Sequence, residues 1–104
     1  MSSIRTIHFK DHKIRLVQMN DQIYYVALDV ASILGYQKAS YMTRVISGSD
    51  KTFATINTSG GDQSMIVISA WGLLTAAVRR KAPQAKELCL WVIGHDVEPV
   101  AIAA

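Results

Sequence analysis

The sequence predicts an α+β fold, in which small antiparallel β-hairpins or one sheet pack against about four short helices. Segments of β-type occur in two groups, and each group is followed by segments with helical periodicity. Only short turns separate the strands within a group, which argues against the βαβ crossovers of a wound parallel sheet. With 104 residues, 50% of them hydrophobic, we expect a single domain over residues 1–104.

The first group of strands is predicted to form a three-stranded meander. The alternation of apolar and polar residues favours strands at 4–9, 13–19 and 23–27, with turns at 10–12 and 20–22.

A short helix is expected directly after the third strand. Asp29 is its expected N-cap, because a carboxylate can accept hydrogen bonds from the free backbone N–H groups of the first turn. Gly35 is expected to end the helix in the left-handed conformation, which costs glycine little, and Tyr36 is expected to fold back onto the apolar face.

The second half of the chain repeats this order. A second helix is expected over 40–46, and a second hairpin is expected to join 51–57 to 64–68 through a loop that contains two glycines. Ser69 is the predicted N-cap of a third helix. The apolar face of this helix is predicted to carry Leu73, Leu74, Ala77 and Val78.

The fourth helix is expected to open at Pro83, since proline is tolerated in a first turn, and to end before Pro99. Its predicted apolar face comprises Ala85, Leu88, Cys89 and Val92.

Composition limits the compartment and the class of partner. No run approaches the roughly 20 apolar residues that span a bilayer, and the first residues lack the apolar core of a signal peptide. Cys89 is the only cysteine and cannot form an internal disulfide, which fits a reducing compartment. We therefore expect a cytoplasmic protein with no membrane partner. The formal net charge of +3 is compatible with nucleic-acid binding but does not establish it.

Two basic segments are the candidate DNA-binding sites, because phosphate contacts need cations gathered on one surface. The first segment offers hydroxyl groups beside its cations, and the second is more strongly basic. The first comprises Lys38, Ser40, Tyr41 and Arg44, and the second comprises Arg79, Arg80, Lys81 and Lys86. Two structural alternatives stay open: Tyr41 as a core residue, and the second segment as a solvated helix end that satisfies its own carbonyls.

No catalytic or metal-binding residue is predicted. His95 and Asp96 lack an accompanying nucleophile, and His8 and His12 have a helical spacing but fall in a strand and its turn. The glycines of the 58–63 loop are not followed by the Gly-Lys-Ser/Thr of a phosphate-binding loop. We expect a protein that is not an enzyme and needs no cofactor.

Several separated blocks, in this order, resemble the Bro-N domain, the N-terminal module of baculovirus BRO proteins and of many phage and prophage antirepressors. The blocks are Tyr25-Val26-Ala27, Asp29-Val30-Ala31, Leu34-Gly35-Tyr36, Ile66-Val67-Ile68-Ser69, Gly72-Leu73-Leu74, and Ala85 with Trp91-Val92 and Val97-Glu98-Pro99. The resemblance implies a compact α+β DNA-binding domain in viral or prophage gene regulation, without a cofactor.

The predicted function is therefore a non-enzymatic regulator that contacts mainly DNA phosphates, because cations are plentiful and no Asn/Gln pair suited to base recognition lies on a predicted helix. A domain this small is expected to act as a homodimer that reads two half-sites. The alternative is a module that binds a repressor protein instead of DNA. Exposure of Trp71, Trp91 and the 100–102 tail as one patch would favour that alternative.

Overall fold

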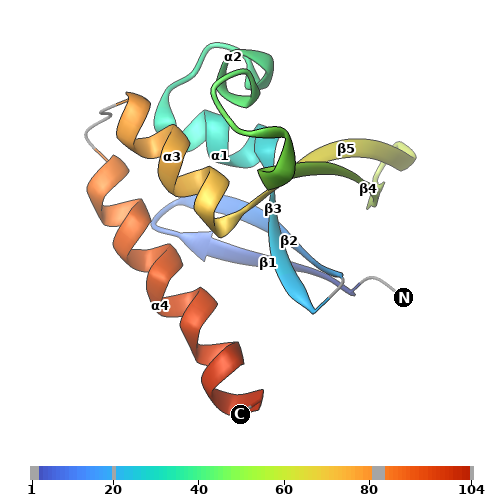
Figure 1. Ribbon diagram of the computed structural model, residues 1–104. Helices are drawn as coiled ribbons and strands as arrows, with labels where there is room; N and C mark the ends of the chain where they lie inside the picture. The colour runs from blue at the N-terminus through green and yellow to red at the C-terminus, as the bar shows by residue number, and fades with distance from the viewer. Residues whose placement is uncertain (1–2, 20, 81–83, 104) are drawn as a thin grey trace.

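Within residues 3–19, 21–80 and 84–103, which the computed structural model describes, the chain forms one five-stranded antiparallel sheet and four α-helices (Figure 1). The elements are β1 (Ser3–Phe9), β2 (His12–Met19), β3 (Gln22–Val26), α1 (Ala27–Leu34), α2 (Ala39–Thr43), the 3-10 helix η1 (Gly48–Asp50), β4 (Lys51–Thr58), β5 (Gly61–Ser69), α3 (Ala70–Arg80) and α4 (Ala85–Ala103). The predicted α+β class is confirmed. Pro83, the predicted start of the fourth helix, lies outside the described residues.

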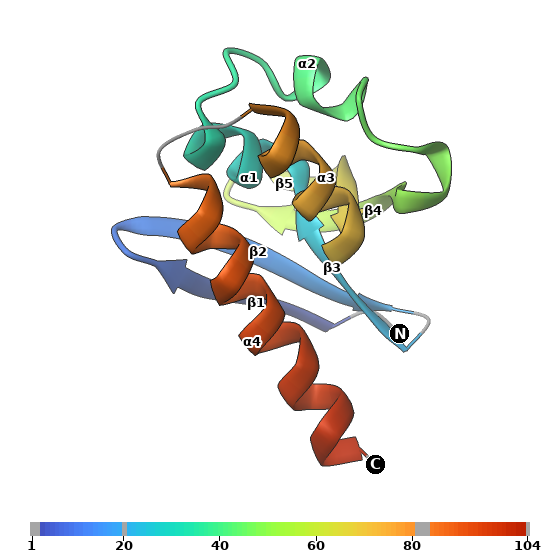
Figure 2. The same cartoon turned by 60° about the vertical axis from the view of Figure 1, so that its left-hand side comes forward.

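The sheet has the strand order β1-β2-β3-β5-β4, so β1 and β4 are its edges. Helices α1, α3 and α4 lie on one side of it in both views (Figures 1 and 2). The main core fills the space between them, where Tyr25, Ile14, Leu34, Leu73 and Leu88 are fully buried. Strand residues of period two and helix residues of period 3.6 thus meet in one apolar layer.

A second, smaller core lies on the opposite face of the sheet. Val17 and Val26 are fully buried there together with Ile56 and Val67. Because successive strand residues point to opposite faces, Leu16 and Tyr25 join the main core while their neighbours Val17 and Val26 join this one.

The start of α1 differs from the prediction. The helix begins at Ala27, and its N-cap position is Val26, which makes no side-chain capping bond. Asp29 therefore is not the N-cap. Its carboxylate instead accepts hydrogen bonds from Arg15 on β2, because a paired guanidinium is a stronger partner than the backbone of its own helix.

The ends of the other helices differ in smaller ways. Helix α2 ends at Thr43, and single turns rather than a regular helix continue to Ile46. Helix α4 does not stop before Pro99 but continues to Ala103. Proline removes one backbone hydrogen bond, yet its fixed φ is close to the helical value, so a helix can include it. None of the helices in the described part of the chain has the length and apolar character needed to cross a membrane.

The predicted second hairpin is confirmed. Thr58 pairs with Gly61 across a two-residue turn, and Gly61 has a φ of 100°, a value that favours glycine. The predicted cap of α3 is confirmed as well, since the Ser69 hydroxyl accepts a hydrogen bond of 3.1 Å from the Gly72 N–H.

Candidate nucleic-acid interface

Gly35 sets the direction in which the chain leaves α1. It has a φ of 81°, its N–H donates to the Ser32 carbonyl at 3.4 Å, and the Tyr36 N–H donates to the Ala31 carbonyl at 3.0 Å. This pair of bonds is a Schellman motif, as the sequence predicts. Tyr36 packs on the main core, so the following segment is directed toward α2.

Tyr36 and Arg80 connect this turn to the C-terminal end of α3. The Tyr36 hydroxyl donates a hydrogen bond of 3.0 Å to the Ala76 carbonyl. The guanidinium of Arg80 lies 5.7 Å from the centre of the Tyr36 ring and donates to the carbonyls of Leu34 (3.3 Å) and Gly35 (2.9 Å). Burial raises the pKa of the Tyr36 hydroxyl, and the nearby positive charges of Arg80 and Arg79 act in the opposite direction.

These contacts bring the Arg79–Arg80 end of α3 to the same end of the molecule as the first predicted basic segment. Helix α2 and the C-terminal end of α3 both lie at the top in two views (Figures 1 and 2). Arg80 has a structural role there, because it satisfies free carbonyls at the negative end of the α1 dipole. The sequence left open that this segment satisfies the carbonyls of its own helix end, whereas Arg80 donates to the carbonyls at the end of α1.

Tyr41 stands between two cations in the first segment. Lys38 Nζ lies 5.8 Å from the centre of its ring and the Arg44 guanidinium carbon lies 5.4 Å from it, both within the range of a cation–π contact. Tyr41 has a relative solvent exposure of 42%, so it is not a core residue. Ser40 is exposed beside it. The four predicted residues of this segment therefore share one accessible surface.

Helix α2 is held firmly beneath this surface. Met42 is fully buried and Ile46 nearly so, which anchors the helix in the main core. Lys51 Nζ donates a hydrogen bond of 2.7 Å to the Thr43 carbonyl at the end of α2. Anchoring of this kind fixes the position of the Lys38–Tyr41–Arg44 cluster on the outer side.

The second segment is less uniform. Arg79 is exposed near the end of α3, and Lys86 is exposed in the first turn of α4. Lys81 lies outside the described residues. Among the described residues, the ion pairs join Lys10 to Glu87 and Arg15 to Asp29. The cations Lys38, Arg44, Arg79 and Lys86 thus have no carboxylate partner within that part of the chain.

The aromatic residues do not form the shared patch that would favour a protein partner. Trp71 is 68% exposed, but Trp91 is half-buried and meets Phe9 edge-to-face, with ring centres 5.5 Å apart. The side chains of the 100–102 tail lie outside the described part. Val78, predicted to face the core, is 69% exposed instead, because the buried face of α3 is centred on Leu73, Ala76 and Ala77.

The described side chains are those of residues 4–19, 21–80 and 84–94. Among them, no three His, Cys, Asp or Glu residues cluster in a way that could bind a metal ion. Burial raises the pKa of the Cys89 thiol, which reduces its thiolate fraction.

A family model described as Bro-N, the N-terminal domain of the BRO family, matches residues 13–99. Neither the curated proteins nor the solved structures provided a match. The matched range includes α1, the α2 cluster and the described part of the second basic segment.

Proposed function

This chain belongs to the Bro-N family, and from that premise we propose that it is a DNA-binding regulator of the viral or prophage type. It would act without catalysis or a cofactor, in the cytoplasm of a bacterial host or inside an infected cell. Family membership supports the class of function, and the arrangement of the basic residues supports the choice of ligand and of the surface that binds it.

The observation that carries the proposal is the Lys38–Tyr41–Arg44 cluster. Its two cations share one exposed ring and have no carboxylate partner among the described residues. Cations without an internal partner are available to neutralise phosphates and release the counterions that surround DNA. The tyrosine and the neighbouring Ser40 hydroxyl can donate hydrogen bonds to phosphate or sugar oxygens.

Arg79 and Lys86 extend the positive surface from the ends of α3 and α4, and Lys81, outside the described residues, belongs to the same basic run. Arg80 contributes charge but is held by the carbonyls of Leu34 and Gly35. Contacts of this composition are mainly to phosphate, so we expect affinity with little base discrimination from a single copy.

A fluorescence-anisotropy titration against duplex and single-stranded DNA, at several salt concentrations, tests the proposal. If Lys38, Arg44, Arg79 and Lys86 each neutralise one duplex phosphate, log K falls against log salt concentration with a slope of about −3 to −4. Replacing Lys38 and Arg44 together by alanine is expected to reduce this slope by about 2 and to weaken binding to all sequences alike.

The matched control is Arg5→Ala. Arg5 is an exposed cation on β1, and β1 and α2 lie on opposite sides of the molecule (Figures 1 and 2). This control is expected to change the salt dependence little. An unchanged slope in the Lys38/Arg44 variant would remove the cluster from the interface, and no binding to either DNA at low salt would overturn the proposal.

The alternative function is that of a domain that binds a repressor protein. One observation favours it, the exposed indole of Trp71, because large aromatic side chains are enriched at the energetic centres of protein interfaces. Failure to bind DNA, together with capture of a purified repressor that is lost on replacing Trp71 by serine, would establish this alternative.

A further inference from the structure

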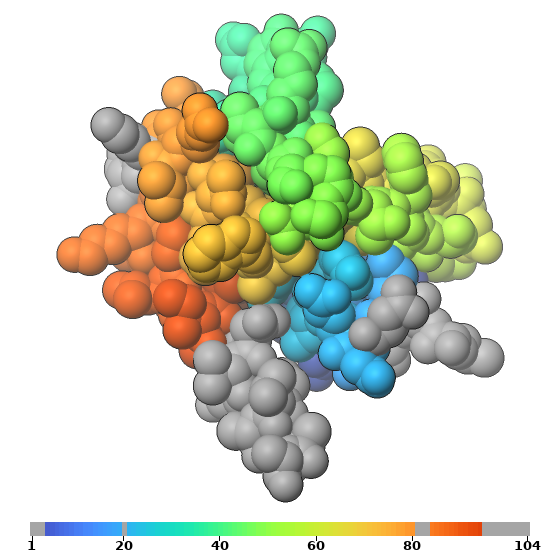
Figure 3. Space-filling model, viewed as in Figure 1, coloured from blue at the N-terminus to red at the C-terminus, as the bar shows by residue number. Residues whose placement is uncertain are grey.

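The outer face of α3 carries apolar side chains that the fold leaves uncovered. Trp71 and Val78 are 68% and 69% exposed, Leu74 and Thr75 are half-buried, and their spacing places all four on one face of the helix. Figure 3 shows α3 crossing the middle of the molecule on this side, between the 44–50 segment and α4. Among the residues whose side chains are described, neighbouring elements therefore do not cover this face.

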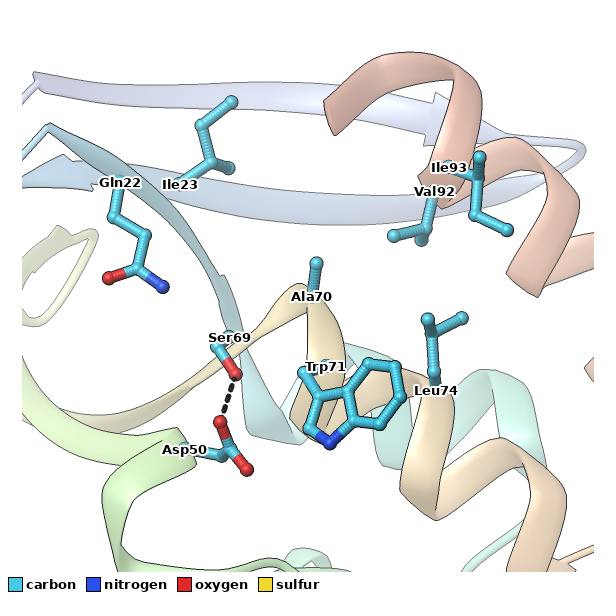
Figure 4. Close-up of a pocket in the computed structure, with 9 residues that line it drawn as sticks. All are labelled: Gln22, Ile23, Asp50, Ser69, Ala70, Trp71, Leu74, Val92 and Ile93. Atoms are coloured by element: carbon cyan, nitrogen blue, oxygen red, sulfur yellow. Dashed lines mark hydrogen bonds between the residues drawn. The ribbon is translucent and has the colours of Figure 1, made fainter. Parts of the chain in front are cut away.

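Two shallow grooves make this face continuous. The first, of about 320 Å³, is lined by Trp71, Leu74 and Ile93 and also by Asp50 (Figure 4). The second, of about 260 Å³, is lined by Trp71 and Leu74 again and by Arg79. Because the same two side chains line both grooves, one apolar surface runs along α3, with an acid near one end and a base near the other.

The two charged groups lie on the same edge of this surface. A Cβ atom at Gly72 would be 3.2 Å from Asp50 Cβ, which places Asp50 beside Gly72. Arg79 follows seven residues later, that is two turns or about 10 Å further along the same side of the helix. Neither charge takes part in an ion pair within the described part of the chain.

We propose that this surface binds the same surface of a second copy of the chain, with the two α3 helices antiparallel about a two-fold axis near Leu74 and Thr75. In a two-fold interface, positions equally distant from the axis meet. Trp71 of one copy then packs against Val78 of the other, since both are equally far from the midpoint. Gly72, with Asp50 beside it, stands two residues nearer the midpoint than Arg79, so Asp50 of one copy and Arg79 of the other are offset by about 3 Å along the helix, which a long arginine side chain can span. This contact occurs twice.

The complementarity of size and charge is what selects a second copy as the occupant. A large indole faces a smaller side chain beside a groove, and each carboxylate faces a guanidinium. This inference does not rest on DNA binding, because the Lys38–Tyr41–Arg44 cluster is no part of the surface. In this pairing Arg79 contacts a carboxylate, so in the dimer the phosphates are neutralised by Lys38, Arg44 and Lys86, and the salt slope per copy is about −3.

Sedimentation equilibrium of the full chain over a series of concentrations tests the pairing. The wild-type protein is expected to dimerise, and Val78→Asp is expected to weaken dimerisation by about tenfold or more, because it places a carboxylate in the apolar contact. The control is Phe53→Ser, which removes an equally exposed side chain (67%) from β4 and leaves dimerisation unchanged. A protein that stays monomeric throughout, or a dimer that Val78→Asp does not weaken, would overturn the proposal.

A charge exchange tests the antiparallel arrangement itself. Arg79→Glu and Asp50→Lys are each expected to weaken self-association, because each brings like charges together. An equimolar mixture of the two variants is expected to form a mixed dimer at least about tenfold tighter than either variant alone, since both charged contacts are restored. Circular dichroism of each variant verifies folding, which matters because Asp50 accepts a hydrogen bond from Ser69. A mixture no tighter than its components would rule out this arrangement.

Discussion

Arg15 donates three hydrogen bonds to the carboxylate of Asp29, from its backbone N–H (2.9 Å), from Nε (2.9 Å) and from Nη2 (2.8 Å). The pair is partly shielded from water, with side-chain exposures of 27% and 14%. The hydrogen bond to Asp29 raises the pKa of Arg15, while burial acts against it. The contact fastens the start of α1 to β2, so the helix that ends at Gly35 begins from a fixed point.

Asp29→Asn is expected to lower the free energy of unfolding by about 1–3 kcal/mol, because it removes the charge that the Arg15 guanidinium needs as a partner. Urea denaturation measures the change. The control is Asp62→Asn near the tip of the β4–β5 hairpin, where Asp62 is exposed and contacts only the Asn57 side chain among the described hydrogen bonds. A loss at position 29 no larger than that of the control would contradict a structural role for the pair.

Gly35→Ala is expected to destabilise the protein by about 1–2 kcal/mol, because alanine adopts a left-handed backbone at that cost. Space is not the cause, since the added Cβ would lie 3.6 Å from Arg80 Nη2, an ordinary contact. Gly48→Ala provides the comparison: Gly48 does not have a positive φ, and nothing lies within 4 Å of its Cβ position. Thermal denaturation of both variants should show a loss at position 35 alone.

Arg80 and Lys86 are expected to respond in opposite ways to replacement by alanine. Arg80→Ala leaves the Leu34 and Gly35 carbonyls without their donor and should cost about 1–2 kcal/mol of stability. Lys86→Ala should leave stability within about 0.5 kcal/mol of the wild type and weaken DNA binding instead. Denaturation and anisotropy measured on both variants make the comparison, and equal stability losses would contradict the division of roles.

Local signals in the sequence predict most of the fold. The left-handed turn at Gly35, the Ser69 cap and the β4–β5 hairpin each depend on a few consecutive residues, and all three are confirmed. The Asp29 prediction was wrong because its partner Arg15 lies fourteen residues away in the chain and on another element. Val78 faces outward because α3 turns Leu73 and Ala77 into the core, a choice that packing makes and helical periodicity alone does not.

The candidate site also combines features that the sequence predicts with features that only the packing of the elements creates. Arg44 stands three residues after Tyr41 in helical conformation, so helical spacing predicts that the two lie side by side. Lys38 has an extended backbone and reaches the Tyr41 ring from the N-cap position of α2. The contact of Arg80 with Leu34 joins residues 46 positions apart, and only the packing of α3 beside α1 creates it. The groove that Asp50 and Ile93 line together with Trp71 likewise depends on where η1 and α4 lie. DNA binding by any of these residues stays a prediction.

Cys89 is expected to react slowly with iodoacetamide in the folded protein. Burial raises the pKa of its thiol, so at a given pH less of it is present as the reactive thiolate, and the side chain is also half-buried. The alkylation rate at about pH 8 should therefore be below that of a free thiol and should rise to that value in denaturing urea. A folded-state rate equal to the unfolded-state rate would show that the thiol is neither shielded nor shifted.

Gly72 and Gly94 both lie within helices, yet replacement by alanine is expected to act in opposite directions. Alanine in a helix is normally favoured over glycine by about 1 kcal/mol, and at Gly94 no atom lies within 4 Å of the Cβ position, so Gly94→Ala should stabilise the protein. At Gly72 the new Cβ would lie 3.1 Å from both the Asp50 carbonyl oxygen and Ile46 Cγ2. The carbonyl belongs to the backbone and the side chain to the core, so neither can move away freely.

Gly72→Ala is therefore expected to destabilise the protein by about 1–3 kcal/mol, the usual range for overpacking a core. Urea denaturation of both variants decides the matter, because a propensity effect alone would stabilise both. The close approach at Gly72 also holds Asp50 at the edge of the α3 surface, so Gly72→Ala should weaken self-association if Asp50 contacts Arg79 of a second copy. A variant that is as stable as the wild type would show that the η1 segment moves easily and does not fix the position of Asp50.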